Sequence, residues 1–185
     1  MGAASSFLYP SFMGDLRNIY LVGPMGSGKT AVGRRLAALL DKQFLDSDVE
    51  IEKRTGVDIR YIFEKEGEAR FRDREREVIA DLTGLEGVVL ATGGGAILDP
   101  RTRKRLAATG TVVYLETSLD ALVERTRSAK TRPLLMNGDP RAVLESLMTV
   151  RKPLYEEVAD LKIETTGRTV RAVAADIRER LAAAS

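Results

Sequence analysis

A glycine-rich segment near the start of the chain has the spacing of a phosphate-binding loop. The residues from Gly23 to Thr30 read Gly-Pro-Met-Gly-Ser-Gly-Lys-Thr, which fits the pattern G-x-x-x-x-G-K-[ST]. An apolar run over residues 19–22 precedes them, and residues 31–40 carry apolar side chains at helical spacing. In that setting backbone amides can surround a phosphate, Lys29 can reach the β- and γ-phosphates, and the Thr30 hydroxyl can bind Mg²⁺. With both flanking elements in place, the alternative of a plain glycine-rich turn before a helix is disfavoured.

Two aspartates follow the next short strand-like segment, residues 43–45. Asp46 and Asp48 are two positions apart, so in extended geometry both side chains project toward the same side. Beside a phosphate loop, one carboxylate can hold the water shell of Mg²⁺, and the other can hydrogen-bond the hydroxyl that attacks the γ-phosphate. The alternative is that Ser47 or Asp48 caps the following helix. The nearby loop favours function, and both interpretations can hold together.

Three arginines are candidates for binding an anion, because a guanidinium binds a carboxylate or phosphate through two parallel hydrogen bonds. Arg72 lies in a run of alternating charge that is also typical of a solvated helix face. Arg132 lies in the polar, turn-rich residues 128–139, which we expect to form a mobile lid able to carry it onto phosphates. Arg151 follows a helical segment. The residue types alone do not decide which of them bind.

Three consecutive glycines, Gly93, Gly94 and Gly95, follow the buried-type strand at residues 88–91. Glycines at the end of a strand allow a ligand to approach the backbone closely and to accept hydrogen bonds from its amides. A tight turn into the next helix explains one or two of them. Three in a row favour a binding site.

Composition narrows the chemistry further. The chain of 185 residues contains neither histidine nor cysteine, which excludes Ser-His triads, thiolate nucleophiles, imidazole bases, thiolate zinc sites and disulfides. Phosphoryl transfer needs none of these groups. The net charge of +2 gives little support to a nucleic-acid partner, although a pI of about 8.9 leaves room for a local basic site. The basic residues 101–105 have no interleaved aromatics and are typical of an exposed helix face. No apolar run approaches the roughly 20 residues of a membrane span.

Strand-like and helix-like patterns alternate along the chain, which predicts an α/β fold with a parallel sheet covered on both faces and ligands at the carboxyl ends of its strands. One domain is expected over residues 17–185, after a disordered extension at 1–16. That extension has no basic segment ahead of its apolar residues, so we expect a cytoplasmic protein. Strands are expected at 19–22, 43–45, 88–91, 111–115 and 160–164, and helices at 31–40, 49–82 with breaks near Gly56 and Gly67, from 100, at 118–127 with Ser118 as N-cap, at 140–157 and at 170–183.

The order and spacing of these motifs resemble those of the shikimate kinase family, P-loop kinases of the nucleoside-monophosphate-kinase type. The resemblance covers about residues 17–183. It implies a three-layer α/β/α P-loop fold with a five-stranded parallel sheet, a helical substrate-binding region and a lid. It also implies transfer of the γ-phosphate of ATP to the 3-hydroxyl of shikimate in aromatic amino-acid synthesis. The motifs are Arg17 to Thr30, Phe44-Leu-Asp-Ser-Asp48, Ile62-Phe63, Gly67-Glu68, Phe71-Arg72, Thr92 to Gly95, Arg132-Pro-Leu-Leu135 and Arg151-Lys-Pro-Leu-Tyr155.

Roles carried over by this resemblance fall on matching positions. Lys29, Asp48 and Arg132 are expected to be catalytic. Thr30 and Asp46 are expected to bind one Mg²⁺. Shikimate is expected to contact Asp48, Arg72, Gly94, Gly95 and Arg151, and ATP to contact Gly26, Ser27, Gly28, Lys29, Thr30, Ala31, Arg125, Arg132 and Arg168. The chain departs from the family in two places: Thr169-Val170 stands where some members have Asn-Pro, and the loop ends in Lys29-Thr30-Ala31 without a second hydroxyl residue.

Two other functions stay open at this point. One is a kinase for another small hydroxy acid such as gluconate. The other is a P-loop module that senses ATP without catalysis, which would have no need of Asp48, Arg72 and Arg151 together. The resemblance implies ATP and shikimate as partners, and we expect neither nucleic acid nor a membrane. It also suggests a monomer.

Overall fold

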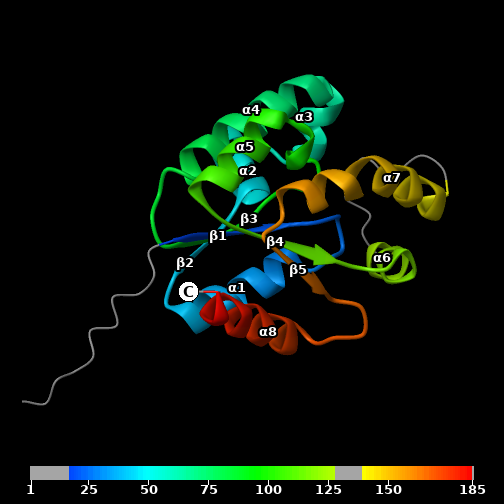
Figure 1. The fold of residues 1–185 in the computed structure, drawn as a ribbon. Coiled ribbons are helices and arrows are strands. Elements are labelled where there is room, and N and C mark those ends of the chain that lie inside the picture. Colours follow the sequence, from blue (N-terminus) through cyan, green and yellow to red (C-terminus); the bar gives the residue numbers. More distant parts are fainter. Residues whose placement is uncertain (1–16, 128–138, 185) are drawn as a thin grey trace, which may run out of the picture.

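A computed structural model describes residues 17–127 and 139–184, and its centre is a parallel sheet of five strands (Figure 1). The strand order is β2-β3-β1-β4-β5, so the first strand lies in the middle of the sheet. All neighbouring pairs are parallel, with Tyr20 paired to Leu90 on one side and to Val112 on the other. The expected five-stranded α/β fold is confirmed. The strands are β1 (Asn18–Val22), β2 (Gln43–Asp46), β3 (Val88–Ala91), β4 (Gly110–Glu116) and β5 (Leu161–Glu164).

Helices cover both faces of the sheet, because its strands alternate side chains between two separate cores. On one face, α1 (Lys29–Leu40) packs beside α8 (Val170–Ala183) over Leu21, Val89 and Val113. On the other face, α4 (Gly67–Leu82), α5 (Pro100–Thr109) and α7 (Pro140–Val158) cover Tyr20, Leu90 and Tyr114. Figure 1 shows the two groups of helices on opposite sides of the strands.

The predicted charged helical region is three helices, α2 (Ser47–Thr55), α3 (Ile59–Lys65) and α4. The breaks fall where expected, at Gly56 and Gly67, whose φ angles of 72° and 84° favour glycine. Helix α6 (Leu119–Thr126) begins after Ser118, whose side chain accepts a hydrogen bond from the amide of Ala121, as the predicted N-cap should. A short 3₁₀ helix, η1 (Ala96–Leu98), follows the glycine triplet and was not predicted.

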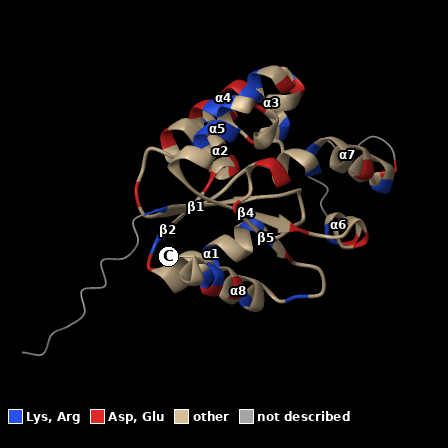
Figure 2. Cartoon of the chain, viewed as in Figure 1, with Lys and Arg blue, Asp and Glu red and all other residues tan. Residues whose placement is uncertain are grey.

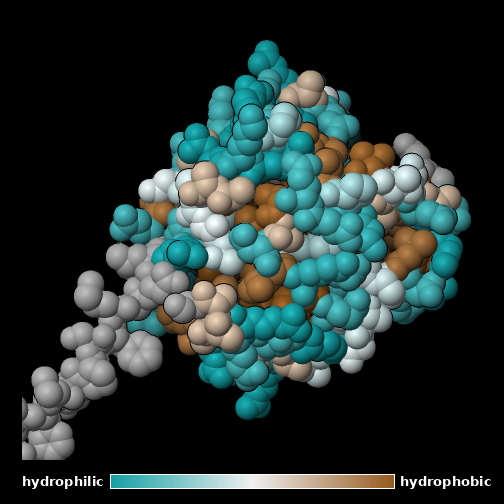
Figure 3. Space-filling view, viewed as in Figure 1, coloured by the Kyte–Doolittle hydropathy of each residue, from teal (hydrophilic) through white to brown (hydrophobic). Residues whose placement is uncertain are grey.

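The surface carries mixed charge. Figure 2 shows basic and acidic residues interspersed on the helices. Figure 3 shows mostly hydrophilic side chains over α3 and α4, and hydrophobic patches nearer the sheet and toward α7. Among the described residues, no helix is both long and apolar enough to cross a membrane. The expected extension at 1–16 lies outside the described residues, as does the expected lid at 128–139 apart from Asp139, which caps α7.

Candidate active site

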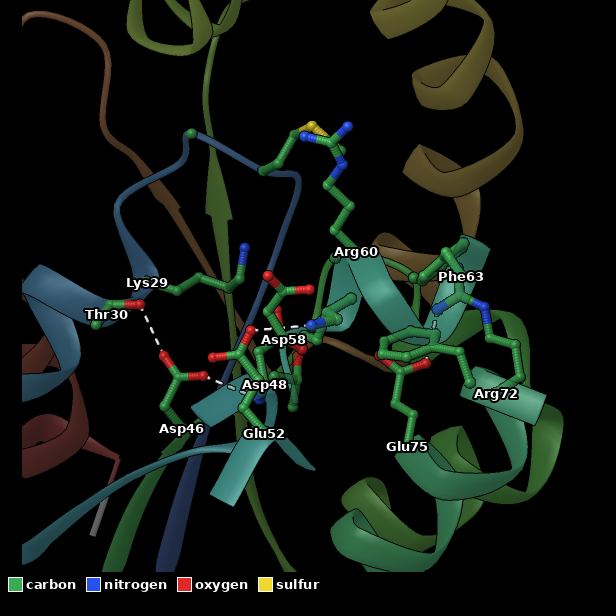
Figure 4. A pocket seen from close by; sticks show the side chains of 18 of the residues that line it. Lys29, Thr30, Asp46, Asp48, Glu52, Asp58, Arg60, Phe63, Arg72 and Glu75 are labelled. Atoms are coloured by element: carbon green, nitrogen blue, oxygen red, sulfur yellow. Dashed lines mark hydrogen bonds and ion pairs between the residues drawn. The ribbon is translucent and has the colours of Figure 1, made fainter. Parts of the chain in front are cut away.

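A cavity of about 780 Å³ opens at the carboxyl ends of β1, β2 and β3 (Figure 4). This is the edge of a parallel sheet where ligands are expected. The phosphate loop, the start of α2, helices α3 and α4 and the glycine triplet all contribute to its wall. Its lining includes the predicted residues Gly26, Gly28, Lys29, Thr30, Ala31, Asp46, Asp48, Arg72, Gly94 and Gly95, together with Met25, Glu52, Asp58, Ile59, Arg60, Phe63, Phe71, Glu75, Thr92 and Gly93.

The phosphate loop joins β1 to α1 through backbone that only glycine adopts easily. Gly26 and Gly28 have φ angles of 82° and 92°, and Gly28 is the N-cap of α1. The helix therefore begins at the loop with its first amides and its partial positive charge available to an anion. Lys29 Nζ donates to the carbonyls of Gly23 and Pro24 at 2.7 and 2.8 Å, which folds its ammonium over the loop. Ser27, also predicted to contact ATP, is a buried residue of the loop and is not among the residues that line the cavity.

Asp46 connects the loop to α2. Its Oδ2 accepts a hydrogen bond from Thr30 Oγ1 at 2.8 Å, and its Oδ1 accepts from the amides of Asp48 and Val49 at 3.0 and 3.4 Å (Figure 4). Asp46 is thus the N-cap of α2, and the expectation that Ser47 or Asp48 caps this helix is wrong. The reason is that β2 remains extended through Asp46, whose φ and ψ are −134° and 123°.

Asp48 consequently lies in the first turn of α2, and the prediction that extended geometry aligns it with Asp46 is wrong. Both carboxylates nevertheless line the cavity. Asp48 Oδ1 is shut off from solvent and has no hydrogen-bond partner in the described part of the chain. Burial, and after it the charges of Glu75 and Asp46, raise the pKa of Asp48 from 3.8 to about 7, against the opposing charge of Lys29. A carboxyl group with this pKa can exchange a proton near neutral pH.

Arg72 on α4 is turned into the cavity rather than left on a solvated face. Its guanidinium pairs with Glu75 Oε2 at 2.7 Å and with Glu68 Oε1 at 2.9 Å. Glu75 is buried, and burial raises its pKa although the charges of Arg72 and Arg151 lower it. Its other oxygen, Oε1, has no hydrogen-bond partner among the described residues. The buried Glu75 carboxylate therefore holds the Arg72 guanidinium in place.

Glu75 was not singled out from the sequence, although a signal for it exists. It lies among Phe71, Val78, Ile79 and Leu82, at the i, i+4, i+7 spacing of the buried face of α4. An acidic residue on an apolar face is rarely buried unless it is paired. Arg72, three positions earlier on the same helix, is the partner that this placement requires.

The glycine triplet is packed against the site, so each position has a steric reason to be glycine. A Cβ at Gly93 would collide with Glu75 Oε1 and Asp48 Oδ1, and a Cβ at Gly95 would collide with the Arg72 guanidinium. A Cβ at Gly94 would lie 3.3 Å from the amide nitrogen of Met25 in the phosphate loop. We expected a ligand to approach the backbone of the triplet closely. In the structure, the side chains of Asp48, Glu75 and Arg72 make this close approach.

Three of the remaining predicted arginines, Arg125, Arg151 and Arg168, do not line the cavity. Arg151 on α7 is buried, with its Nη1 3.7 Å from the position of a Cβ on Gly94. Arg125 donates to the carbonyls of Gly26 and Thr165, both at 3.2 Å, and so ties the phosphate loop to the end of β5. Arg168 pairs with Asp176 of α8 at 2.8 Å. Arg132 lies outside the described residues.

The loop between β1 and α1, the strand order of the sheet and the acids at its carboxyl edge define the class of P-loop kinases. A family model described as shikimate kinase matches residues 25–182. The chain belongs to the shikimate kinase family, which confirms the resemblance that its motifs carry.

Individual relatives agree with this assignment. A shikimate kinase of Shewanella pealeana is 55% identical over 91% of this chain and 99% of that relative. A solved shikimate kinase of Acinetobacter baumannii, in complex with shikimate, has a TM-score of 0.91 at 49% identity, covering 93% of this chain and 96% of that one. A gluconokinase from Sinorhizobium meliloti has a TM-score of 0.56 at 19% identity, with 92% and 98% covered, which shows a shared fold alone.

Proposed function

We propose that the chain transfers the γ-phosphoryl group of ATP to the 3-hydroxyl of shikimate, giving shikimate 3-phosphate and ADP. The observation that carries this proposal is that one cavity joins a phosphate loop, the Asp48 carboxylate and the inward-facing guanidinium of Arg72. The buried Oδ1 of Asp48 has no hydrogen-bond partner among the described residues. The loop can bind the triphosphate of ATP, Asp48 can bind a substrate hydroxyl, and Arg72 can bind a substrate carboxylate. Membership of the family supports shikimate as the compound that carries the last two.

In this reaction the 3-hydroxyl oxygen forms a bond to the γ-phosphorus, and the bond from that phosphorus to the β,γ-bridging oxygen breaks. ADP leaves with the electron pair of the broken bond. Asp48 orients the hydroxyl and accepts its proton, which a pKa of about 7 allows at neutral pH. Lys29 neutralises charge on the transferring group, and Arg132 is predicted to join it from the lid.

One Mg²⁺ fits the oxygen ligands at the start of α1. The Thr30 hydroxyl would bind the ion directly, and Asp46, hydrogen-bonded to that hydroxyl, would hold its water shell. Among the described residues, no group of three or more acidic side chains could hold a metal. The two oxygens therefore suit an ion that takes its other ligands from water and phosphate. When bound, Mg²⁺ neutralises charge on the β- and γ-phosphate oxygens.

The carboxylate of shikimate is assigned to Arg72 and Arg151, which approach the glycine triplet from α4 and α7. The amides of Gly94 and Gly95 would donate hydrogen bonds beside them. For ATP, the phosphates are assigned to the loop from Gly26 to Ala31. The contacts of Arg125 and Arg168 with the nucleotide stay predictions.

The test is a coupled assay of ADP release with shikimate, quinate and gluconate supplied separately. We expect turnover with shikimate well above the ATPase background. Turnover with gluconate alone would favour the other hydroxy acid, and ATP binding without turnover of any acid would favour the sensing module. The cytoplasmic location and the monomeric state stay predictions, the second of which light scattering on the purified protein would test.

A further inference from the structure

Two tyrosines lie face to face behind the glycine triplet. The rings of Tyr114 on β4 and Tyr155 on α7 are stacked, with centroids 5.1 Å apart and planes 19° apart. Both side chains are fully buried. Their hydroxyls differ, because Tyr155 Oη donates to the carbonyl of Gly94 at 2.5 Å, whereas Tyr114 Oη has no partner among residues 17–127 and 139–184. Replacing each tyrosine by phenylalanine therefore compares the loss of a hydrogen-bonded hydroxyl with the loss of an unpartnered one, while the buried ring is kept.

The Gly94 carbonyl belongs to the peptide unit whose N–H is that of Gly95. In a planar trans peptide the carbonyl and the N–H point in opposite directions. A hydrogen bond that fixes the carbonyl on the α7 side therefore also fixes the direction of the Gly95 N–H. That N–H donates no hydrogen bond within the described residues, although Gly95 is buried and lines the cavity. A buried donor of this kind normally has a partner, which a ligand can supply.

The surroundings of Gly95 and Tyr155 indicate which part of a ligand is involved. The Arg72 guanidinium lies so close to Gly95 that a Cβ there would collide with it. Arg151 is four residues before Tyr155 on α7, and therefore on the same side of that helix. The Gly95 amide thus lies among the groups assigned to a carboxylate rather than those assigned to the triphosphate.

We propose that Tyr155 is a positioning residue, whose hydroxyl fixes the Gly94–Gly95 peptide so that the Gly95 N–H points at the carboxylate of the acceptor substrate. This inference rests on the proposed function. Burial raises the pKa of Tyr155 although the charge of Arg151 lowers it, so the hydroxyl stays protonated and donates over the working pH range.

The phosphate loop is held by other contacts. Lys29 bonds to the carbonyls of Gly23 and Pro24, and Arg125 bonds to that of Gly26. Loss of the Tyr155 hydroxyl should therefore weaken binding of the acceptor and leave that of ATP nearly unchanged.

The experiment compares Tyr155→Phe with Tyr114→Phe, which removes the unpartnered hydroxyl of the same stack. We expect Tyr155→Phe to raise the KM for shikimate about five-fold or more, as loss of one hydrogen bond would. The KM for ATP should stay within about two-fold, and Tyr114→Phe should leave both constants within that limit. Hydrogen exchange at the Gly95 amide of the free protein should become faster in Tyr155→Phe only.

Equal shikimate KM values for the two variants, or an equal rise in the KM for ATP, would overturn the proposal. If the wild type gave no turnover with shikimate, the proposed function would fail, and the exchange measurement would still decide the inference. Faster exchange in Tyr155→Phe alone would then support it, and equal exchange in both variants would overturn it. Thermal unfolding of both variants checks that each is folded.

Discussion

Asp48 and Glu75 both lie against the backbone of Gly93, and each has one buried oxygen without a hydrogen-bond partner in the described chain. Their other surroundings differ. Arg72 pairs with the second oxygen of Glu75 at 2.7 Å, whereas Asp48 has no arginine against it among the contacts of this site. Glu75 therefore holds the Arg72 guanidinium, whereas Asp48 is available to bind a substrate hydroxyl.

The raised pKa of Asp48 makes the stability of the free protein depend on pH. Its folded pKa of about 7 exceeds the ordinary 3.8, so the folded state binds more protons than the unfolded state between these values. Stability contributed by this group is therefore present at acid pH and is lost as pH rises toward 7. Asp48→Asn should reduce the loss between about pH 5 and pH 8 by on the order of 1 kcal/mol.

Urea denaturation in EDTA without nucleotide measures this effect. Asp58→Asn is the matched control, because Asp58 lines the same cavity as the N-cap of α3 and asparagine also caps helices. If Asp48→Asn retained the pH dependence of the wild type, the assigned pKa would be wrong.

Arg72→Lys keeps the positive charge beside Glu75 but removes the planar fork that binds a carboxylate. We expect the KM for shikimate to rise about ten-fold or more, with the KM for ATP within about two-fold. Steady-state kinetics with each substrate varied in turn provides the measurement. Equal losses for both substrates would contradict the assignment of Arg72 to the acceptor.

Lys29→Met should lower kcat by about 100-fold or more, because the ammonium is assigned to the charge that develops on the transferring phosphoryl group. Lys53→Met on α2 is the control, since that side chain is 77% exposed. Circular dichroism should give similar spectra for both variants. Turnover near the wild-type level in Lys29→Met would remove the loop lysine from the mechanism.

Gly95→Ala tests the packing of the triplet. The backbone at Gly95 has φ −101° and ψ 0°, which alanine can adopt, so the effect should come from the Cβ that displaces the Arg72 guanidinium. We expect the KM for shikimate to rise about ten-fold while the melting temperature changes little, because a flexible side chain can move. Gly84→Ala is the control, because Gly84 is exposed after α4 and a Cβ there would come no closer than 3.3 Å to another atom. A rise in the KM for shikimate in Gly84→Ala as large as in Gly95→Ala would contradict this account.

The fold was largely readable from the sequence, because each strand of the sheet is a short apolar run bounded by turn residues. The breaks at Gly56 and Gly67 and the cap at Ser118 follow from local backbone chemistry, which sequence patterns report directly. The cap of α2 was misassigned because extended backbone continues through Asp46, and neighbouring residues of similar capping strength do not reveal where a strand ends.

The parts of the site that were not predicted depend on contacts distant in sequence. Tyr155 meets the carbonyl of Gly94 across 61 positions, and nothing in the local sequence announces that contact. Glu75 left a signal on the apolar face of α4, but its proximity to Gly93 arises only when α4 packs over β3. Local patterns therefore predicted the candidate residues, and the packing of helices on the sheet determines how those residues are held.

The most direct measurement of the central claim is identification of the product by ³¹P and ¹H nuclear magnetic resonance, with ADP measured in the same reaction. The purified chain is supplied with ATP, Mg²⁺ and shikimate. We predict one ADP for each shikimate consumed and a phosphate ester on the 3-hydroxyl. ADP formed at the same rate without shikimate, or an ester on a different hydroxyl, would contradict the proposed reaction.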